Sequence, residues 1–190
     1  LMMSLWDALR MNMMISYQEL VRTFPWDHNI TVQENIRSPL PAGKVYLSPV
    51  IDCFDGQVVS WSIGTRPDAT LVNTMLDDAL DTLSEHDKPV IHSDRGGHYR
   101  WPGWLERINT SGLIRSMSRK GCSSDNAACE GFFGRIKNEM FYGRDWAGIT
   151  LEKFICFLDR YIRWYNEKRI KLSLGAMSPV KYRQHLGITT

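Results

Sequence analysis

The sequence predicts an α/β fold, a mixed β-sheet flanked by helices. Two runs rich in β-branched and aromatic residues, 44–52 and 57–63, are joined by an Asp-Gly turn, which is typical of a β-hairpin. Apolar residues then recur at helical spacing over 69–83, and strand-like and helical runs alternate after them. Hydrophobic residues make up 43% of the 190 residues, which is enough to form a core. One α/β sandwich is therefore the expected architecture.

The elements before and within the hairpin are predicted with unequal clarity. Residues 2–22 have the pattern of a weak helix, and residues 29–33 have the composition of a strand. Pro49 stands inside the first hairpin run. Because proline cannot donate a backbone hydrogen bond, it indicates an edge strand or a bulge there. Residues 65–68 are polar and contain a proline, and they predict the start of the helix at 69–83.

The remaining elements follow in alternating order. They are strands at 88–93 and 113–117, and helices at 101–109, 125–142, 151–164 and from Ser178 onward. The aromatic residues Tyr161, Trp164 and Tyr165 lie among basic residues. They could pack in the core or stack on nucleic-acid bases, and their spacing favours the core.

Charge is distributed unevenly along the chain. Residues 1–99 hold 7 basic and 13 acidic residues, whereas residues 100–190 hold 16 basic and 8 acidic ones. A second half with a formal charge of +8 predicts a basic face for a polyanion, although a solvated helical surface would give the same count. No uncharged apolar run reaches 18 residues, so no membrane partner is expected. The four cysteines form no Cys-x-x-Cys pair, which indicates reduced thiols in the cytoplasm and no zinc site.

Asp94 and Glu130 are the most informative pair of residues. Asp94 ends an apolar strand-like run, and Glu130 lies near the start of a helical run. Carboxylates placed in this way can hold divalent cations that activate a water and stabilise a leaving oxygen at phosphorus. Lys137 is seven residues beyond Glu130, nearly two helical turns, and would share its face. The alternatives are a turn residue for Asp94, an exposed helix acid for Glu130 and a surface charge for Lys137. The hairpin acids Asp52 and Asp55 are weaker candidates as ligands, and Asp55 is most simply a turn residue.

Several strings in this sequence, in this order, resemble the integrase core of insertion-sequence type-3 transposases, which are relatives of retroviral integrases. They are Lys44-Val45-Tyr46-Leu47-Ser48-Pro49-Val50-Ile51-Asp52, Ile91-His92-Ser93-Asp94, Ser116-Met117-Ser118-Arg119-Lys120-Gly121, Asp125-Asn126-Ala127, Tyr165-Asn166 and Ser178-Pro179. The resemblance implies an RNase H-like fold and a catalytic triad of two aspartates and a glutamate. It makes Asp94 the second acid and Glu130 the third.

The resemblance also implies cofactors and partners. Two Mg²⁺ or Mn²⁺ ions would be held by Asp94 and Glu130. Transposon-end and target DNA would be contacted by Lys137, Arg119 and Lys120, and the protein would self-associate on that DNA. In the implied reaction, water cuts a transposon end and the freed 3′-hydroxyl attacks target DNA.

The first acid of the triad departs from the family pattern. The family register, carried back from Asp52, lands on Glu34, whose extra methylene displaces its oxygens in a site that tolerates little displacement. Residues 1–38 form an unmatched segment, and residues 39–190 form the core-like domain. The sequence therefore predicts a transposase core with impaired DNA cleavage and strand transfer. The alternative is a catalytically dead remnant that binds DNA.

Overall fold

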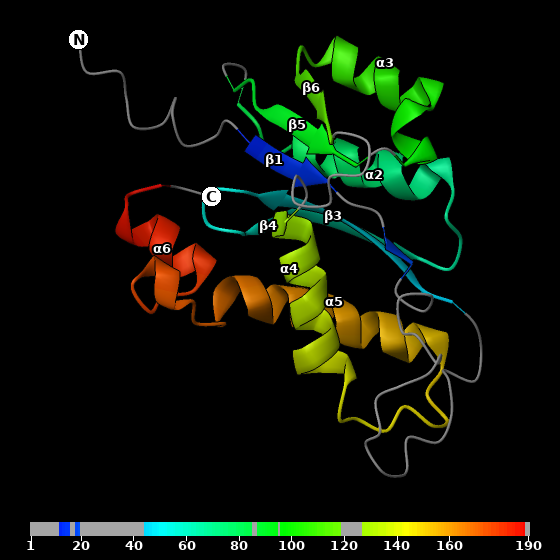
Figure 1. Cartoon of the computed structure of the whole chain (residues 1–190), viewed down its shortest axis with the longest axis vertical. Helices are drawn as coiled ribbons and strands as arrows, with labels where there is room; N and C mark the ends of the chain where they lie inside the picture. The colour runs from blue at the N-terminus through cyan, green and yellow to red at the C-terminus, as the bar shows by residue number, and fades with distance from the viewer. Residues whose placement is uncertain are drawn as a thin grey trace.

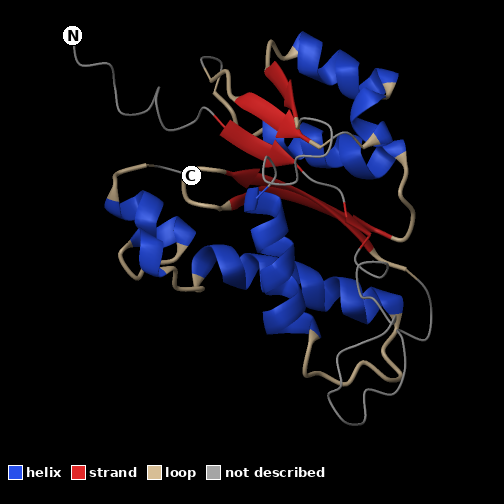
Figure 2. Cartoon of the chain, viewed as in Figure 1, coloured by secondary structure: helices blue, strands red, loops and turns tan. Residues whose placement is uncertain are grey.

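The computed structural model describes residues 44–84, 87–94, 96–118 and 127–188, together with the backbone of two short strands at 12–15 and 18–19. A twisted sheet lies between two layers of helices, as Figures 1 and 2 show. The strands are β1 (Asn12–Ile15), β2 (Gln18–Glu19), β3 (Tyr46–Asp52), β4 (Val58–Gly64), β5 (Val90–Ser93) and β6 (Ile114–Met117). The α/β sandwich predicted from the order of elements is confirmed.

The helices lie close to their predicted ranges. The α-helices are α2 (Ala69–Leu80), α3 (Pro102–Thr110), α4 (Ala127–Arg135), α5 (Leu151–Glu167) and α6 (Pro179–His185). Short 3₁₀ turns occur at η1 (Gly97–Arg100) and η4 (Leu172–Leu174). After Arg135, α4 continues as a π-helix, η3 (Ile136–Phe141), a change of winding that side-chain periodicity did not indicate.

The sheet is mixed and places β1 at its centre. β1 pairs antiparallel with β3 on one side and parallel with β5 on the other. β6 extends the sheet beyond β5, and β4 pairs with the opposite side of β3. β2 also pairs with β3, in the register that β1 sets, so β1 and β2 are two parts of one interrupted strand.

The weak helix expected over residues 2–22 is wrong for residues 12–15 and 18–19, which are strands. Both β3 and β5 have an edge that must be paired. The backbone pairing available at those two edges therefore outweighs the local helical pattern.

Pro49 was expected to mark an edge strand or a bulge. It does not lie on an edge strand, because β3 is paired on both sides. Within the β3–β4 ladder, Pro49 is opposite Trp61. The ladder shifts register between Val50 and Ile51, one residue further on. The predicted bulge is therefore found next to the proline, where the strand adapts to the missing donor.

Each face of the sheet has its own apolar core. α2 and α3 cover one face, and their buried residues pack on Val50 and Ile91. α4, η3 and α5 cover the other face, where Leu47, Ile51 and Val58 meet an aromatic-rich cluster. The helix starts predicted near residues 65–68 and at Ser178 are found, since Asp68 accepts from the backbone of α2 and Ser178 from that of α6.

The C-terminal part is tied to the sheet by polar groups. The Asn166 side chain accepts from the Val58 backbone N–H at 3.0 Å and donates to its carbonyl at 2.8 Å. Arg183 of α6 forms ion pairs with both Asp52 and Asp55 of the hairpin.

Among the residues that the structure describes, no helix combines the length and apolarity needed to cross a membrane.

Candidate functional site

Asp94 lies directly after β5, at the end of the strand as predicted. Its Oδ1 accepts a hydrogen bond of 2.7 Å from the Gly96 backbone N–H. Burial raises the pKa of Asp94, against smaller lowering effects of the Gly96 N–H and of the charges on His98 and His92. The site therefore holds this carboxylate at a cost in free energy, which is common at functional positions.

His92 fixes the end of β5 to the neighbouring strand. Its two ring nitrogens lie 2.9 Å from the hydroxyl of Ser116 and 3.0 Å from that of Ser118. The Ser118 backbone N–H also bonds the Ser93 carbonyl at 2.9 Å. The segment that carries Asp94 is therefore tied to β6 and to Ser118, the residue that follows it.

Glu130 lies in the first turn of α4 and is exposed. The neighbouring face of this helix is buried through Cys129, Phe132 and Phe133, which belong to the core on that side of the sheet. α4 packs against both β1 and β3. The apolar face of α4 thus fixes the helix across the central strands, with Glu130 beside that buried face.

The Cys129 thiol lies within the electrostatic range of both predicted acids. Cys129 is fully buried, and its pKa is raised chiefly by burial, then by the neighbouring Cys53, Asp94 and Glu130. Both carboxylates act on the same thiol, so each lies within electrostatic range of Cys129. That Asp94 and Glu130 reach a shared divalent ion stays a prediction.

No carboxylate is found on the central strand. β1 reads Asn-Met-Met-Ile, and Ile15 is level with Ser93, the residue before Asp94. Ser16 and Tyr17 follow in the sequence. The next acid, Glu19 in β2, is four residues beyond Ile15, or about 13 Å along an extended strand. Glu34 lies outside the described residues.

The donor set is incomplete for a two-ion centre. Carboxylate oxygens are suitable ligands for Mg²⁺, so Asp94 and Glu130 are chemically appropriate. Over the described part of the chain, however, no three His, Cys, Asp or Glu side chains gather to hold a metal ion. The described residues by themselves therefore supply too few ligands for a pair of ions.

The predicted DNA contacts are described only in part. Lys137 is half-buried, and burial lowers the pKa of its ammonium. It lies in η3, so the assumption of α-helical geometry holds only as far as Arg135. Arg119 and Lys120 lie outside the described residues.

The hairpin acids have structural partners. Arg183 bonds Asp52 and Asp55 at 2.6 Å each, and Asp55 also accepts from the Gln57 backbone at 2.8 Å, as a turn residue does. Burial raises the pKa of Asp52. The turn role predicted for Asp55 is confirmed, and the ion pair with Arg183 was not anticipated.

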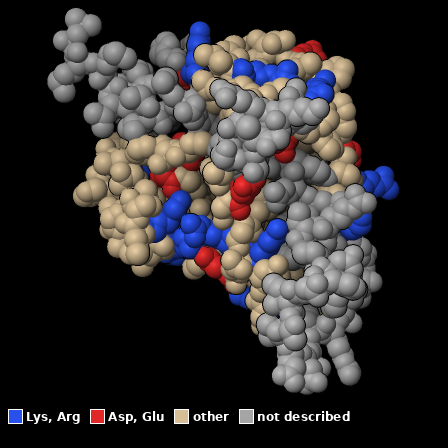
Figure 3. All heavy atoms as spheres, in the orientation of Figure 1, with Lys and Arg blue, Asp and Glu red and all other residues tan. Residues whose placement is uncertain are grey.

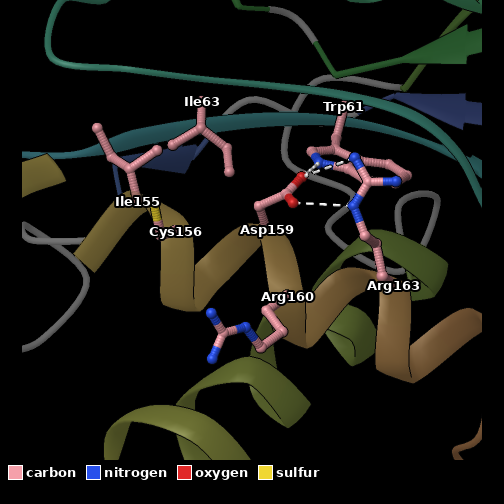
Figure 4. A pocket seen from close by; sticks show the side chains of 7 residues that line it. All are labelled: Trp61, Ile63, Ile155, Cys156, Asp159, Arg160 and Arg163. Atoms are coloured by element: carbon pink, nitrogen blue, oxygen red, sulfur yellow. Dashed lines mark hydrogen bonds and ion pairs between the residues drawn. The ribbon is translucent and has the colours of Figure 1, made fainter. Parts of the chain in front are cut away.

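Sequence reasoning missed an open groove of about 550 Å³ between β4 and α5. Figure 4 shows Asp159 between Trp61 and Arg163: it accepts from the indole N–H at 2.9 Å and pairs with the guanidinium at 2.9 Å. The four-residue spacing of Asp159 and Arg163 was a visible signal. The hydrogen bond from Trp61 to Asp159 gave no such signal, because it joins residues that are distant in the sequence.

Comparison with known proteins identifies the fold and the family. Two models described as integrase core domain match residues 14–123 and 130–186. The catalytic core domain of HTLV-2 integrase, solved with magnesium in a trimeric form, superposes with a TM-score of 0.61 at 15% identity. That match covers 91% of this chain and 95% of the integrase domain. The predicted RNase H-like fold is confirmed.

Two curated relatives are bacterial transposases. The probable transposase of insertion sequence element IS1353 from Shigella flexneri is 62% identical over 78% of this chain. The putative transposase InsK of IS150 from Escherichia coli is 43% identical over 74% of it. This chain spans 29% of the first protein and 49% of the second. The chain belongs to the integrase core domain family and is similar to the transposases of IS3-type insertion sequences.

Proposed function

We propose that this chain is the integrase-core part of an insertion-sequence transposase, in which DNA cleavage and strand transfer are strongly impaired. One observation carries the proposal. The strand β1, which lies between β3 and β5 in this integrase-core fold, reads Asn-Met-Met-Ile and carries no acid. The integrase-core fold is retained, while the described part of the central strand offers no first carboxylate beside the proposed Asp94 and Glu130.

DNA binding is supported by charge. The second half of the chain has the excess of basic residues, and Figure 3 shows Lys and Arg side chains gathered on the face in view where α4 and α5 lie. Such residues meet phosphates without reading sequence. Lys137, Arg119 and Lys120 are the proposed contacts with transposon-end and target DNA. We also propose self-association on that DNA, and a cytoplasmic location.

The impairment follows from ligand number. With Asp94 and Glu130 alone, one Mg²⁺ or Mn²⁺ is weakly held, and a second ion has no ligand of its own among the described residues. Phosphoryl transfer by a two-ion centre requires both ions at fixed separation. We therefore expect the chain to bind DNA while turning it over at a very low rate.

The test restores the missing acid. Cleavage of a labelled duplex carrying an insertion-sequence end is measured with Mg²⁺ and with Mn²⁺. Met14→Asp and Ile15→Asp form a matched pair, because neighbouring residues on a strand point to opposite faces. One of the two should raise cleavage by at least about tenfold and the other should not. Glu34→Asp, tested in parallel, decides whether the register-equivalent acid contributes.

The outcomes separate the proposed function from its rival. Restored cleavage that Glu130→Gln abolishes would support an impaired catalytic core. No cleavage in any variant, with salt-sensitive DNA binding intact, would favour the catalytically dead DNA-binding remnant. Robust cleavage by the unmodified chain that survives Glu130→Gln would contradict the assignment of the acids.

A further inference from the structure

The outer side of α5 carries a regular stripe of cationic and aromatic residues. We propose that this stripe binds single-stranded DNA, which deepens the proposed function by giving one kind of DNA its own surface. The α5 stripe consists of Lys153, Phe157, Arg160, Trp164 and Lys168. These residues are three or four positions apart, so they follow one side of the helix, with Lys168 as its C-cap.

The two aromatic rings of the stripe are held by the protein and yet open to solvent. Phe157 is 40% exposed and Trp164 is 44% exposed, whereas the neighbouring Tyr161 and Tyr165 are buried. Phe157 packs edge-on against Trp146 with centroids 5.9 Å apart, and Trp164 packs against Tyr161 at 5.6 Å. A ring fixed on one side and exposed on another is suited to stacking, because little conformational freedom is lost on binding.

The three cations of the stripe have no carboxylate partner among the described residues. The acids of α5 are engaged elsewhere. Asp159 is bound by Trp61 and Arg163, Glu167 acts on Arg163, and Glu152 is hydrogen-bonded to Thr150.

Arg160 lines the rim of the groove but takes no part in the hydrogen bonds of Trp61, Asp159 and Arg163. Figure 4 shows its side chain turned away from the Trp61–Asp159–Arg163 group, and its guanidinium lies 5.8 Å from the centre of the Phe157 ring. The stripe therefore presents three positive charges that no described carboxylate neutralises.

Aromatic rings between cations favour a single strand over a duplex. Phosphates alone would satisfy the cations, but a base can stack on Phe157 or Trp164 only if it is unpaired. Lys153 and Arg160 are seven residues apart, as are Phe157 and Trp164, so the pattern repeats every ~10 Å. A stacked strand rises ~3.4 Å per nucleotide, so each repeat matches about three nucleotides.

The position of the stripe relates it to the carboxylates. α4 and α5 cover the same face of the sheet, as Figure 1 shows. A strand bound along α5 would therefore lie on the same side of the molecule as the helix that carries Glu130.

The test compares binding of a labelled 12-nucleotide thymidine strand and a 12-base-pair duplex by fluorescence anisotropy at fixed salt. Trp164→Ala should weaken binding of the single strand ~5- to 100-fold and change duplex binding by less than about twofold. Trp164→Phe should retain most of the affinity, because the ring remains. Leu172→Ala is the control for an exposed apolar side chain, and Lys181→Ala is the charge-matched control for Arg160→Ala.

Each outcome decides the proposal. Selective loss of single-strand binding in Trp164→Ala and Phe157→Ala, with Leu172→Ala unchanged, supports the stripe. An equal loss of affinity for strand and duplex, or no loss for either, overturns the stripe proposal. In that case the proposed function stands as long as the unmodified chain binds the duplex. An altered sedimentation rate of the DNA-free Trp164→Ala chain would instead make the stripe a contact between copies and also overturn it. Absence of binding to both DNAs would contradict the proposed function as well.

Discussion

Arg183 links α6 to the hairpin and offers the sharpest test of what holds this fold together. Its guanidinium donates to Asp52 at 2.6 Å, and to the two oxygens of Asp55 at 2.6 and 3.1 Å. The three side chains are only 12%, 8% and 0% exposed. Arg183→Met removes the charge but keeps much of the aliphatic volume, so it leaves two buried carboxylates without a cation.

The expected cost is large because these charges are shielded from water. Breaking a buried ion pair by removing one partner costs about 3–5 kcal/mol, against a total stability of about 5–15 kcal/mol for a domain. Arg163→Met is the matched control, since Arg163 pairs with Asp159 in a similar geometry but is 62% exposed. An exposed pair of this kind contributes under about 1 kcal/mol. Urea denaturation of both variants and the parent chain measures the difference.

The loss should also depend on pH. Burial raises the pKa of Asp52, so its ionised form costs stability at neutral pH, and that cost disappears as pH falls through the folded-state pKa. Without Arg183 this pKa rises further, because the opposing positive charge is gone. The destabilisation by Arg183→Met should therefore shrink between pH 7 and about pH 4. A cost below about 1 kcal/mol, a cost equal to that of Arg163→Met, or a cost independent of pH would refute the reasoning.

Three further expectations concern single side chains. Asn166→Leu removes two hydrogen bonds and leaves the Val58 backbone unpaired, so it should cost about 2 kcal/mol in urea denaturation; an unchanged midpoint would contradict this. Cys129 should react with a thiol reagent only as the chain unfolds, whereas the exposed Cys156 reacts at once, and equal rates would rule out the buried core of α4. Asp94→Asn should raise stability by up to about 1 kcal/mol at neutral pH, because the raised pKa marks an unfavourable charge, and the gain should vanish at acid pH. Thermal melts across pH without divalent ions check this last expectation, and a destabilised Asp94→Asn variant would be contrary to it.

Much of the fold could be predicted because local signals agree with the tertiary structure. The helix at 69–83 was expected from its apolar stripe, and α2 ends at Leu80 with Leu71, Met75 and Leu76 buried. The Asp-Gly turn predicted the β3–β4 hairpin in the same way. The positions of Asp94 after a strand and of Glu130 near a helix start could be predicted because each stands at the boundary of a strongly patterned element, whereas their role as metal ligands stays a prediction.

The features that sequence could not supply all depend on distant contacts. Arg183 meets Asp52 and Asp55 across more than 120 residues, and no local pattern signals such a pair. The π-helical turn after Arg135 likewise keeps an apolar periodicity close to that of an α-helix, so Ile136 and Met140 are buried in either case. Exposed and buried aromatic residues on α5 also look alike in sequence, and only the packed structure separates Trp164 from Tyr161.

The central strand shows that a sheet can form without the side chain that a catalytic site on it would need. Residues 12–15 have no β-branched enrichment beyond Ile15, yet they form a strand because β3 and β5 each present an edge that must be paired. Any short apolar segment that reaches this gap can satisfy those backbone groups, whatever its side chains. A phosphoryl-transfer site is more demanding, because it also needs a carboxylate at one position of the same strand. The sheet can therefore close around Asn-Met-Met-Ile between β3 and β5 although none of these four positions carries the carboxylate that the reaction requires.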